Sequence, residues 1–71
     1  MEITQPMVLD QYRARAAYKK KNRGEVDLRE GQIVDVAEKN PNGWWFVNVD
    51  DAQGWVPATY LEPLDTYVPW T

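Results

Sequence analysis

Residues 44–61 read WWFVNVDDAQGWVPATYL and decide the fold of this chain. Residues 44–49 are rich in aromatic and β-branched side chains and form the best strand in the sequence. The polar run at 50–54 ends in a glycine and predicts a hairpin turn, after which residues 55–57 begin the next short strand. Residues 58–60 are long enough only for a helical turn. The stretch therefore predicts an antiparallel hairpin followed by a tight turn.

On either side of this hairpin lie further short apolar segments separated by turn signals. Residues 12–16 alternate between apolar and polar, which suits a strand, although the same alanine-rich stretch also fits one stripe of a helix. Residues 26–28 alternate as well, the stretch 33–37 is short and β-branched, and residues 61–64 close the set. The Asn-Pro-Asn-Gly run at 40–43 is a strong turn signal.

Five short strands with no long helix and no repeat predict an all-β fold, a small barrel or sandwich. A barrel protects its sheet edges by closing on itself. We expect an N-terminal arm at 1–9, one domain at 10–64 and a C-terminal tail at 65–71. The predicted core consists of small and branched side chains, as a narrow interior requires: Ala14, Val26, Leu28, Val34, Val36, Val47, Val56 and Leu61.

The composition argues against an enzyme and against a metal or cofactor site. The 71 residues include no cysteine, no histidine and no serine, which excludes disulfides, thiol and imidazole chemistry, and the usual zinc ligands. Neither a glycine-rich phosphate loop nor a nucleophile elbow is present. No apolar run approaches the ~20 residues of a membrane span. We therefore expect a non-catalytic, soluble, cytoplasmic domain that is monomeric in isolation and needs no cofactor.

The net charge of −3 hides an asymmetry along the chain. Residues 1–24 carry six basic and two acidic side chains, a balance of +4, whereas residues 25–71 carry two basic and nine acidic ones, a balance of −7. A nucleic-acid-binding domain is expected to be basic overall, so nucleic acid is not an expected partner. The basic side chains gather at 19–23, in a polar stretch that we expect to be a loop.

The surplus of aromatic residues is the most informative feature for function. Trp44 and Trp45 are adjacent on a predicted strand, so their side chains point to opposite faces. If one joins the packed face, the other lies outside, where a large apolar ring is best explained by a ligand that covers it. The alternative is that both rings pack at the edges of the core. Together with neighbouring aromatic residues, an exposed tryptophan forms the kind of surface that polyproline-II segments bind.

Four segments of this sequence resemble the motifs of Src-homology 3 (SH3) domains, in the same order and with matching spacing. Residues 14–18 (ARAAY) resemble the ALYDY segment, and residues 25–31 (EVDLREG) resemble the acidic end of the RT loop with its diverging turn. Residues 43–45 resemble the tryptophan pair, and residues 54–61 (GWVPATYL) resemble the closing motif. The resemblance covers residues 10–64 and is strongest to SH3 domains of oxidase-organiser and podosome scaffold proteins, adaptors that carry several SH3 copies beside a lipid-binding domain.

This resemblance implies a five-stranded SH3-like barrel with a short 3-10 turn before the last strand. It also implies a protein-interaction module for signalling or scaffold assembly, whose partners are Pro-rich (PxxP) segments of other proteins. The residues expected to line the peptide-binding site are Tyr18, Glu25, Trp44, Trp55, Pro57 and Tyr60. Trp44 would separate the proline pockets from a specificity pocket, and Glu25 would pair with an arginine or lysine of the ligand. No catalytic or metal-binding residue is implied.

Three positions depart from the family pattern. Ala16 stands where many members have an aromatic ring, and Thr59 stands where an asparagine often bonds the ligand backbone. The loop at 19–23 is basic where the family is usually acidic. A charge run of this kind is usually a solvated face. The alternative is that it disfavours basic ligands, or that it contacts acidic partner surfaces or anionic phosphoinositide lipid, so that membrane contact is the second function considered.

Overall fold

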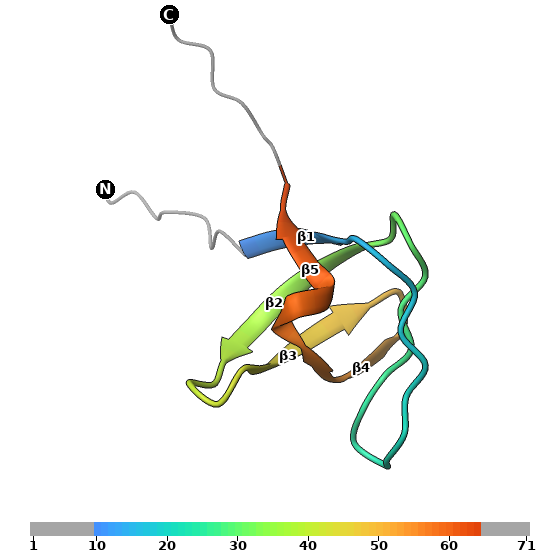
Figure 1. The fold of residues 1–71 in the computed structure, drawn as a ribbon, viewed down its shortest axis with the longest axis vertical. Coiled ribbons are helices and arrows are strands. Elements are labelled where there is room, and N and C mark those ends of the chain that lie inside the picture. The colour runs from blue at the N-terminus through green and yellow to red at the C-terminus, as the bar shows by residue number, and fades with distance from the viewer. Residues whose placement is uncertain (1–9, 65–71) are drawn as a thin grey trace, which may run out of the picture.

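The structure is a computed structural model that describes residues 10–64 of the chain. The arm and tail predicted at 1–9 and 65–71 lie outside the described residues. The described part contains five short strands and one 3-10 turn. Figure 1 shows their arrangement. The elements, in chain order, are β1 (Asp10–Ala14), β2 (Ile33–Lys39), β3 (Trp44–Val49), β4 (Ala52–Pro57), the 3-10 turn η1 (Ala58–Tyr60) and β5 (Leu61–Pro63).

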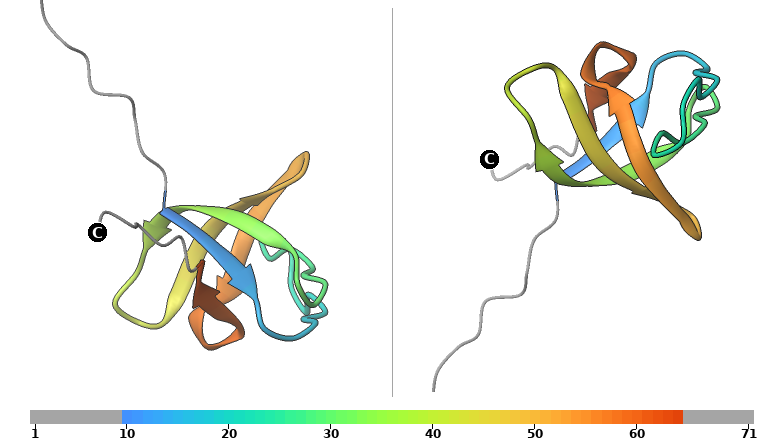
Figure 2. Two further views of the ribbon diagram at one scale, coloured as in Figure 1. Left: turned by 90° about the horizontal axis from the view of Figure 1, so that it is seen from above. Right: turned by 90° about the horizontal axis from the view of Figure 1, so that it is seen from below.

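The strands form one antiparallel sheet in the order β4-β3-β2-β1-β5, and Figure 2 shows that this sheet is strongly curved. A register shift between Val36 and Glu38 marks a bulge where β2 pairs with β3. Bulges of this kind bend a strand and help a small sheet to curl. The predicted all-β fold, a five-stranded barrel with a 3-10 turn before the last strand, is confirmed. No helix among residues 10–64 is long and apolar enough to cross a membrane.

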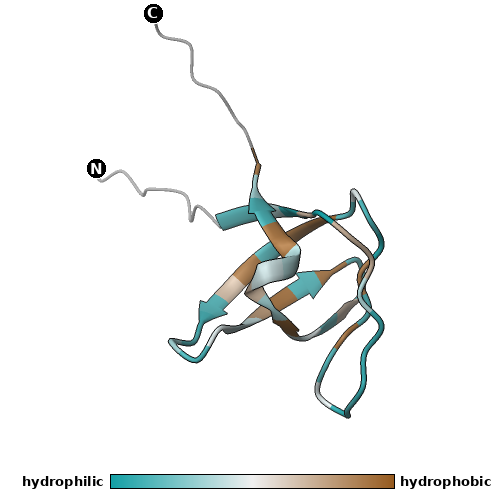
Figure 3. Ribbon diagram, viewed as in Figure 1, coloured by the Kyte–Doolittle hydropathy of each residue, from teal (hydrophilic) through white to brown (hydrophobic). Residues whose placement is uncertain are grey.

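The inner face of the curved sheet holds the hydrophobic core. All eight predicted core residues are buried, and the side chains of Val34, Val47 and Val56 lie deepest. The sequence prediction missed two further core residues, Tyr18 and Val49. Figure 3 shows the hydrophobic residues concentrated on the strands, whereas the tip of the long loop before β2 is hydrophilic. The core is therefore small and built mainly from valine, which fits a narrow barrel.

Three sequence predictions of secondary structure are wrong: the end of the first strand, a strand at 26–28 and the length of the hairpin turn. The first strand ends at Ala14 and does not continue through Ala16, because the chain bends there into the long loop. Residues 26–28 are not a strand: one isolated bridge joins Leu28 to Tyr18 within the loop, and a second joins the neighbouring Glu25 to Trp55 of β4. The hairpin turn is also shorter than predicted. It consists of residues 50–51, and positive φ at Asp50 lets β4 begin two residues later, at Ala52.

The long loop, residues 15–32, connects β1 to β2 and folds back on itself. Tyr18 and Leu28 exchange backbone hydrogen bonds of 3.0 and 2.9 Å, which hold the two arms of the loop together. At its far end, the amide of Trp55 donates to the carbonyl of Gly24 at 2.8 Å, and the amide of Val26 donates to the carbonyl of Trp55 at 3.3 Å. The far end of the long loop is thereby fixed beside strand β4.

Candidate functional site

The outer face of the β3–β4 hairpin carries a set of aromatic side chains. Antiparallel pairing places Trp44 opposite Pro57 and Phe46 opposite Trp55, and residues directly opposite one another share a face of the sheet. The rings of Phe46 and Trp55 meet edge to face, with centroids 5.2 Å apart. Phe46 therefore supports Trp55 from the side, and both tryptophans of this face are half-buried.

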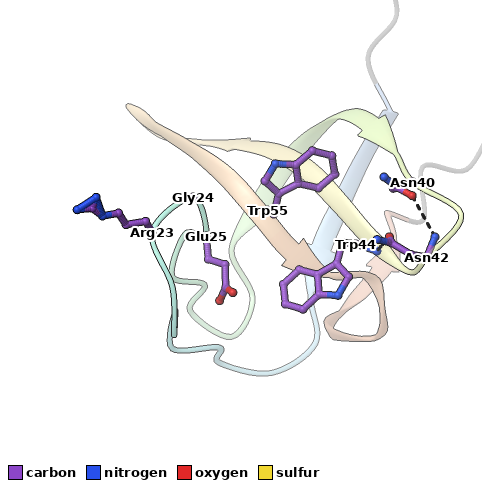
Figure 4. Close-up of a pocket in the computed structure, with 7 residues that line it drawn as sticks. All are labelled: Arg23, Gly24, Glu25, Asn40, Asn42, Trp44 and Trp55. Atoms are coloured by element: carbon purple, nitrogen blue, oxygen red, sulfur yellow. Dashed lines mark hydrogen bonds between the residues drawn. The ribbon is translucent and has the colours of Figure 1, made fainter.

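A cavity of about 310 Å³ opens between the long loop and this aromatic face. Its walls come from three places: the far end of the long loop, the turn before β3, and the two tryptophans (Figure 4). The lining residues are Arg23, Gly24, Glu25, Asn40, Asn42, Trp44 and Trp55. The cavity exists because β4 fixes the loop beside Trp55 through the backbone bonds described above.

Gly54 makes this close approach of loop and strand possible. A Cβ atom at this position would lie 2.9 Å from the carbonyl carbon of Glu25 and 2.9 Å from the carbonyl oxygen of Gly24. Both contacts are to backbone atoms, which do not move aside as a flexible side chain would. Gly54 is thus required by close packing, which distinguishes it from Gly43, where φ is +94° and the surrounding space is open.

Glu25 holds the far end of the long loop together. Its Oε1 atom accepts hydrogen bonds from the Tyr18 hydroxyl at 2.6 Å and from the Lys21 amide at 2.9 Å, and Oε2 accepts one from the Asn22 side chain at 2.9 Å. These donors, the Tyr18 hydroxyl first, lower the pKa of Glu25 to about 2, because they favour the ionised carboxylate. Glu25 is therefore a stable anion whose oxygens already have partners within the loop.

Tyr18 connects the loop to a second pair of rings. Its side chain is buried, and its ring meets that of Tyr60 edge to face with centroids 5.0 Å apart. The hydrogen bond to Glu25, together with burial, raises the pKa of Tyr18 to about 12. Ala16 and Thr59, the two positions where this chain departs from the family pattern, are both exposed. Because Tyr18 is buried and Tyr60 is half-buried, Tyr60 offers more of the ring surface at this end of the site.

Two asparagines shape the turn between β2 and β3. The Asn40 Oδ1 atom accepts a hydrogen bond from the amide of Asn42 at 3.1 Å, and the Asn42 Oδ1 atom accepts one from the amide of Trp44 at 2.9 Å. Side chains of asparagine commonly stabilise turns in this way. Each Oδ1 atom thus has a backbone partner, whereas the amide Nδ2 groups donate to no residue in the range 10–64, and both asparagines line the cavity. The turn thus fixes one wall of the cavity and the position of Trp44 at the start of β3.

The tryptophan pair is divided between the two faces of β3, as the alternation predicts. Trp45 shares its face with the buried Val47 and meets Tyr12 edge to face, with centroids 5.0 Å apart. The Lys39 ammonium lies 4.8 Å from the centre of the Trp45 ring. The difference in burial is smaller than predicted, because both tryptophans are half-buried and both pack against the core. Only Trp44 lines the cavity.

The structure brings the six predicted site residues into one continuous region. Three of them line the cavity: Glu25, Trp44 and Trp55. Pro57 lies opposite Trp44 in the sheet. The other two, Tyr18 and Tyr60, form the adjoining ring pair. The sequence prediction missed four lining residues, Arg23, Gly24, Asn40 and Asn42. Asn40 and Asn42 belong to the strong turn signal before Trp44, and Arg23 belongs to the basic run. Their sequence signals were visible, but their place around a cavity was not.

The chain belongs to the SH3 domain family, whose sequence pattern matches residues 13–58. It is 55% identical over 58 residues to the protein named SH3 and PX domain-containing protein 2A of Homo sapiens. The aligned segment covers 82% of this chain. The chain spans only 5% of the length of that relative. The predicted SH3 family membership is confirmed, and a relative that combines SH3 and PX domains fits the predicted scaffold type.

Solved structures of SH3 domains share this fold. The C-terminal SH3 domain of myosin IB from Entamoeba histolytica, bound to the EhFP10(GEF) peptide, is 29% identical with a TM-score of 0.79, covering 83% of this chain and 98% of that one. The Acanthamoeba myosin I SH3 domain bound to Acan125 is 33% identical with a TM-score of 0.75, covering 78% of this chain and 95% of that one. Both are SH3 domains solved with a bound partner.

Proposed function

We propose that this chain is a non-catalytic interaction module that binds Pro-rich segments of partner proteins in the cytoplasm, for signalling or scaffold assembly. The observation that carries the proposal is the continuous outer region that runs from the Tyr18–Tyr60 ring pair past Pro57 to Trp44 and the cavity. A hydrophobic region of this kind, left half-exposed on a small domain, is typical of a binding surface. The related SH3 domains bound to a peptide and to Acan125 support the same conclusion.

The geometry suits a polyproline-II helix. Such a helix is extended before it binds, has three residues per turn and makes no internal hydrogen bonds, so that binding orders few torsions. Shallow contacts with rings such as Tyr60 and Trp44 are then enough for measurable affinity. Trp44 stands between the ring pair and the cavity, so it would contact the ligand at the centre of its path. The cavity would receive the residue that follows or precedes the proline core.

The test compares two adjacent tryptophans that differ in their surroundings. Replacing Trp44 with alanine should weaken a Pro-rich peptide at least ~30-fold, as truncation of a central aromatic contact typically does. Trp45→Ala is the matched control, because Trp45 packs against Tyr12 and lies outside the cavity. It should lower the free energy of unfolding by about 2 kcal/mol, less than a fully buried tryptophan would, and leave affinity nearly unchanged.

Peptide affinity is measured by isothermal titration calorimetry, and stability by urea titration with tryptophan fluorescence. A Trp44→Ala variant that folds and binds as tightly as the parent chain would overturn the proposed site. If Trp44→Ala and Trp45→Ala are equally stable and lose the same affinity, the peptide does not bind specifically to the outer face of β3. Either result would require a different binding surface.

A further inference from the structure

The polar groups around the cavity are mostly hydrogen-bond donors. Asn40 and Asn42 contribute amide Nδ2 groups that donate to no residue in the range 10–64, whereas each Oδ1 atom already accepts one hydrogen bond from the backbone. The Arg23 guanidinium, which has five donor hydrogens and no acceptor, stands at the rim. The indole N–H groups of Trp44 and Trp55 are donors as well. A cavity with this inventory favours a ligand that brings acceptors.

Among residues 10–64, Glu25 is the one carboxylate that lines the cavity, and its acceptor capacity is largely used. It already accepts three hydrogen bonds, from Tyr18, Lys21 and Asn22, of the roughly four that a carboxylate accepts. A bidentate pair with a ligand arginine needs free acceptor sites on both oxygens, and Oε1 already has two donors. Glu25 thus fixes the loop and has little left for a cationic ligand.

The charge around Glu25 is positive. The long loop carries six basic and three acidic side chains, a balance of +3, and the turn at 40–43 has no charge. Lys19, Lys20, Lys21 and Arg23, which we call the basic cluster, are exposed, and none of them forms an ion pair with any residue in the range 10–64. Figure 4 shows the Arg23 side chain extending from the loop in a different direction from Glu25. The same view shows the Arg23 guanidinium extending away from Trp44 and Trp55, so Arg23 stands at the rim of the site and acts on a bound segment through its charge.

We propose that this site prefers a Pro-rich ligand with an acidic side chain, Asp or Glu, beside its proline core, and discriminates against arginine or lysine there. The carboxylate of the ligand would enter the cavity beside the amide groups of Asn40 and Asn42, within the positive field of the basic cluster at the rim. This inference rests on the proposed function and specifies the ligand class for the same surface. It reverses the preference that the sequence analysis assigned to Glu25.

An acidic peptide explains the basic cluster better than a membrane surface does. Arg23 lines the cavity beside Trp44 and Trp55, so its charge acts on a segment bound there. A lipid surface extends over the whole domain and meets the balance of −7 on residues 25–71, whereas a single carboxylate meets mainly the charges within a Debye length, ~8 Å, of its own site. Asn40 and Asn42, whose amide groups are donors, also line the cavity.

The test uses three peptides that share one Pro-rich core and differ only in the two residues at each end, which are glutamate, glutamine or arginine. Both ends are varied, so that the result holds for either direction of binding. Affinities are measured by fluorescence anisotropy at low and at near-physiological salt. We expect the glutamate peptide to bind about threefold more tightly than the glutamine peptide, and the arginine peptide to bind more weakly still. The differences should shrink as salt rises.

Arg23→Glu should reverse this order, whereas Arg29→Glu is the matched control. Arg29 lies in the same loop and gives the same change in net charge, but it lines a different hollow. A preference for the arginine peptide in the parent chain would overturn the inference while leaving the proposed function intact, provided that the glutamine peptide still depends on Trp44. Failure of all three peptides to bind would overturn both. Binding to vesicles of phosphatidylcholine and phosphatidylserine, with no preference among the peptides, would assign the basic cluster to a membrane and overturn the inference.

Discussion

Replacing Gly54 with alanine should destabilise the domain and weaken the peptide site together, although it adds only one methyl group. The new Cβ would lie 2.9 Å from two backbone atoms of the long loop, the carbonyl carbon of Glu25 and the carbonyl oxygen of Gly24, and 3.0 Å from the carbonyl oxygen of Glu25. Gly54 does not have the positive φ that makes alanine unfavourable at Gly43. The entire effect is therefore steric, and relief requires that the loop move away from β4.

The expected cost follows from the contacts that this movement disturbs. Overpacking a tightly packed site by one methyl group typically costs ~1–3 kcal/mol. The two backbone hydrogen bonds that join the loop to Trp55, of 2.8 and 3.3 Å, would also weaken, and each contributes about 0.5–1.5 kcal/mol net. We expect a loss of about 2–4 kcal/mol in the free energy of unfolding. A domain of this size rarely has more than ~3–5 kcal/mol in total, so the variant should be close to unfolding at room temperature.

The measurement is urea or thermal unfolding followed by tryptophan fluorescence, with Gln53→Ala as the control. Gln53 is exposed on the same strand, so its replacement should change stability by no more than about 0.5 kcal/mol. A loss of 2 kcal/mol should lower Tm by roughly 8–16 °C in a domain of this length. If the free energy of unfolding of Gly54→Ala lies within about 0.5 kcal/mol of the parent value, the loop is not held against β4 as described. The cavity beside Trp55 would then also need a different explanation.

Two further predictions concern the binding surface. Because the pKa of Glu25 is lowered from 4.5 to about 2, its stabilising effect is complete above pH 4.5 and is lost as the pH falls toward 2. Glu25→Gln should flatten the dependence of unfolding free energy on pH in that interval, as measured by urea titrations at several pH values, and an unchanged slope would contradict the loop-fixing role. Ala16→Tyr should tighten a Pro-rich peptide about fivefold, because Ala16 is exposed where the family often has a ring beside Tyr60. Unchanged affinity in calorimetry would mean that position 16 lies off the surface.

The local sequence pattern was sufficient for the strands and for most of the core. Successive side chains of a strand point to opposite faces, so the apolar residues of 33–37 and 44–49 indicated which face of each strand points to the core. Val34, Val36 and Val47 are buried as predicted. The same rule separated Trp44 from Trp45. The rule failed at residues 26–28, where alternation is present but only isolated contacts form: Leu28 pairs with Tyr18 of the same loop, and the Val26 amide donates to Trp55 of β4.

Only the tertiary structure decided the contacts between segments that are distant in sequence. The resemblance gave Glu25 a ligand-pairing role, whereas the folded loop surrounds it with donors from Tyr18, Lys21 and Asn22. Tyr18 was expected to line the binding site, and the structure buries its side chain where the two arms of the long loop pair and its ring meets that of Tyr60. The physical reason is that periodicity reports the direction of a side chain from its own strand. Which backbone approaches from elsewhere, as at Gly54, depends on how the whole sheet curls.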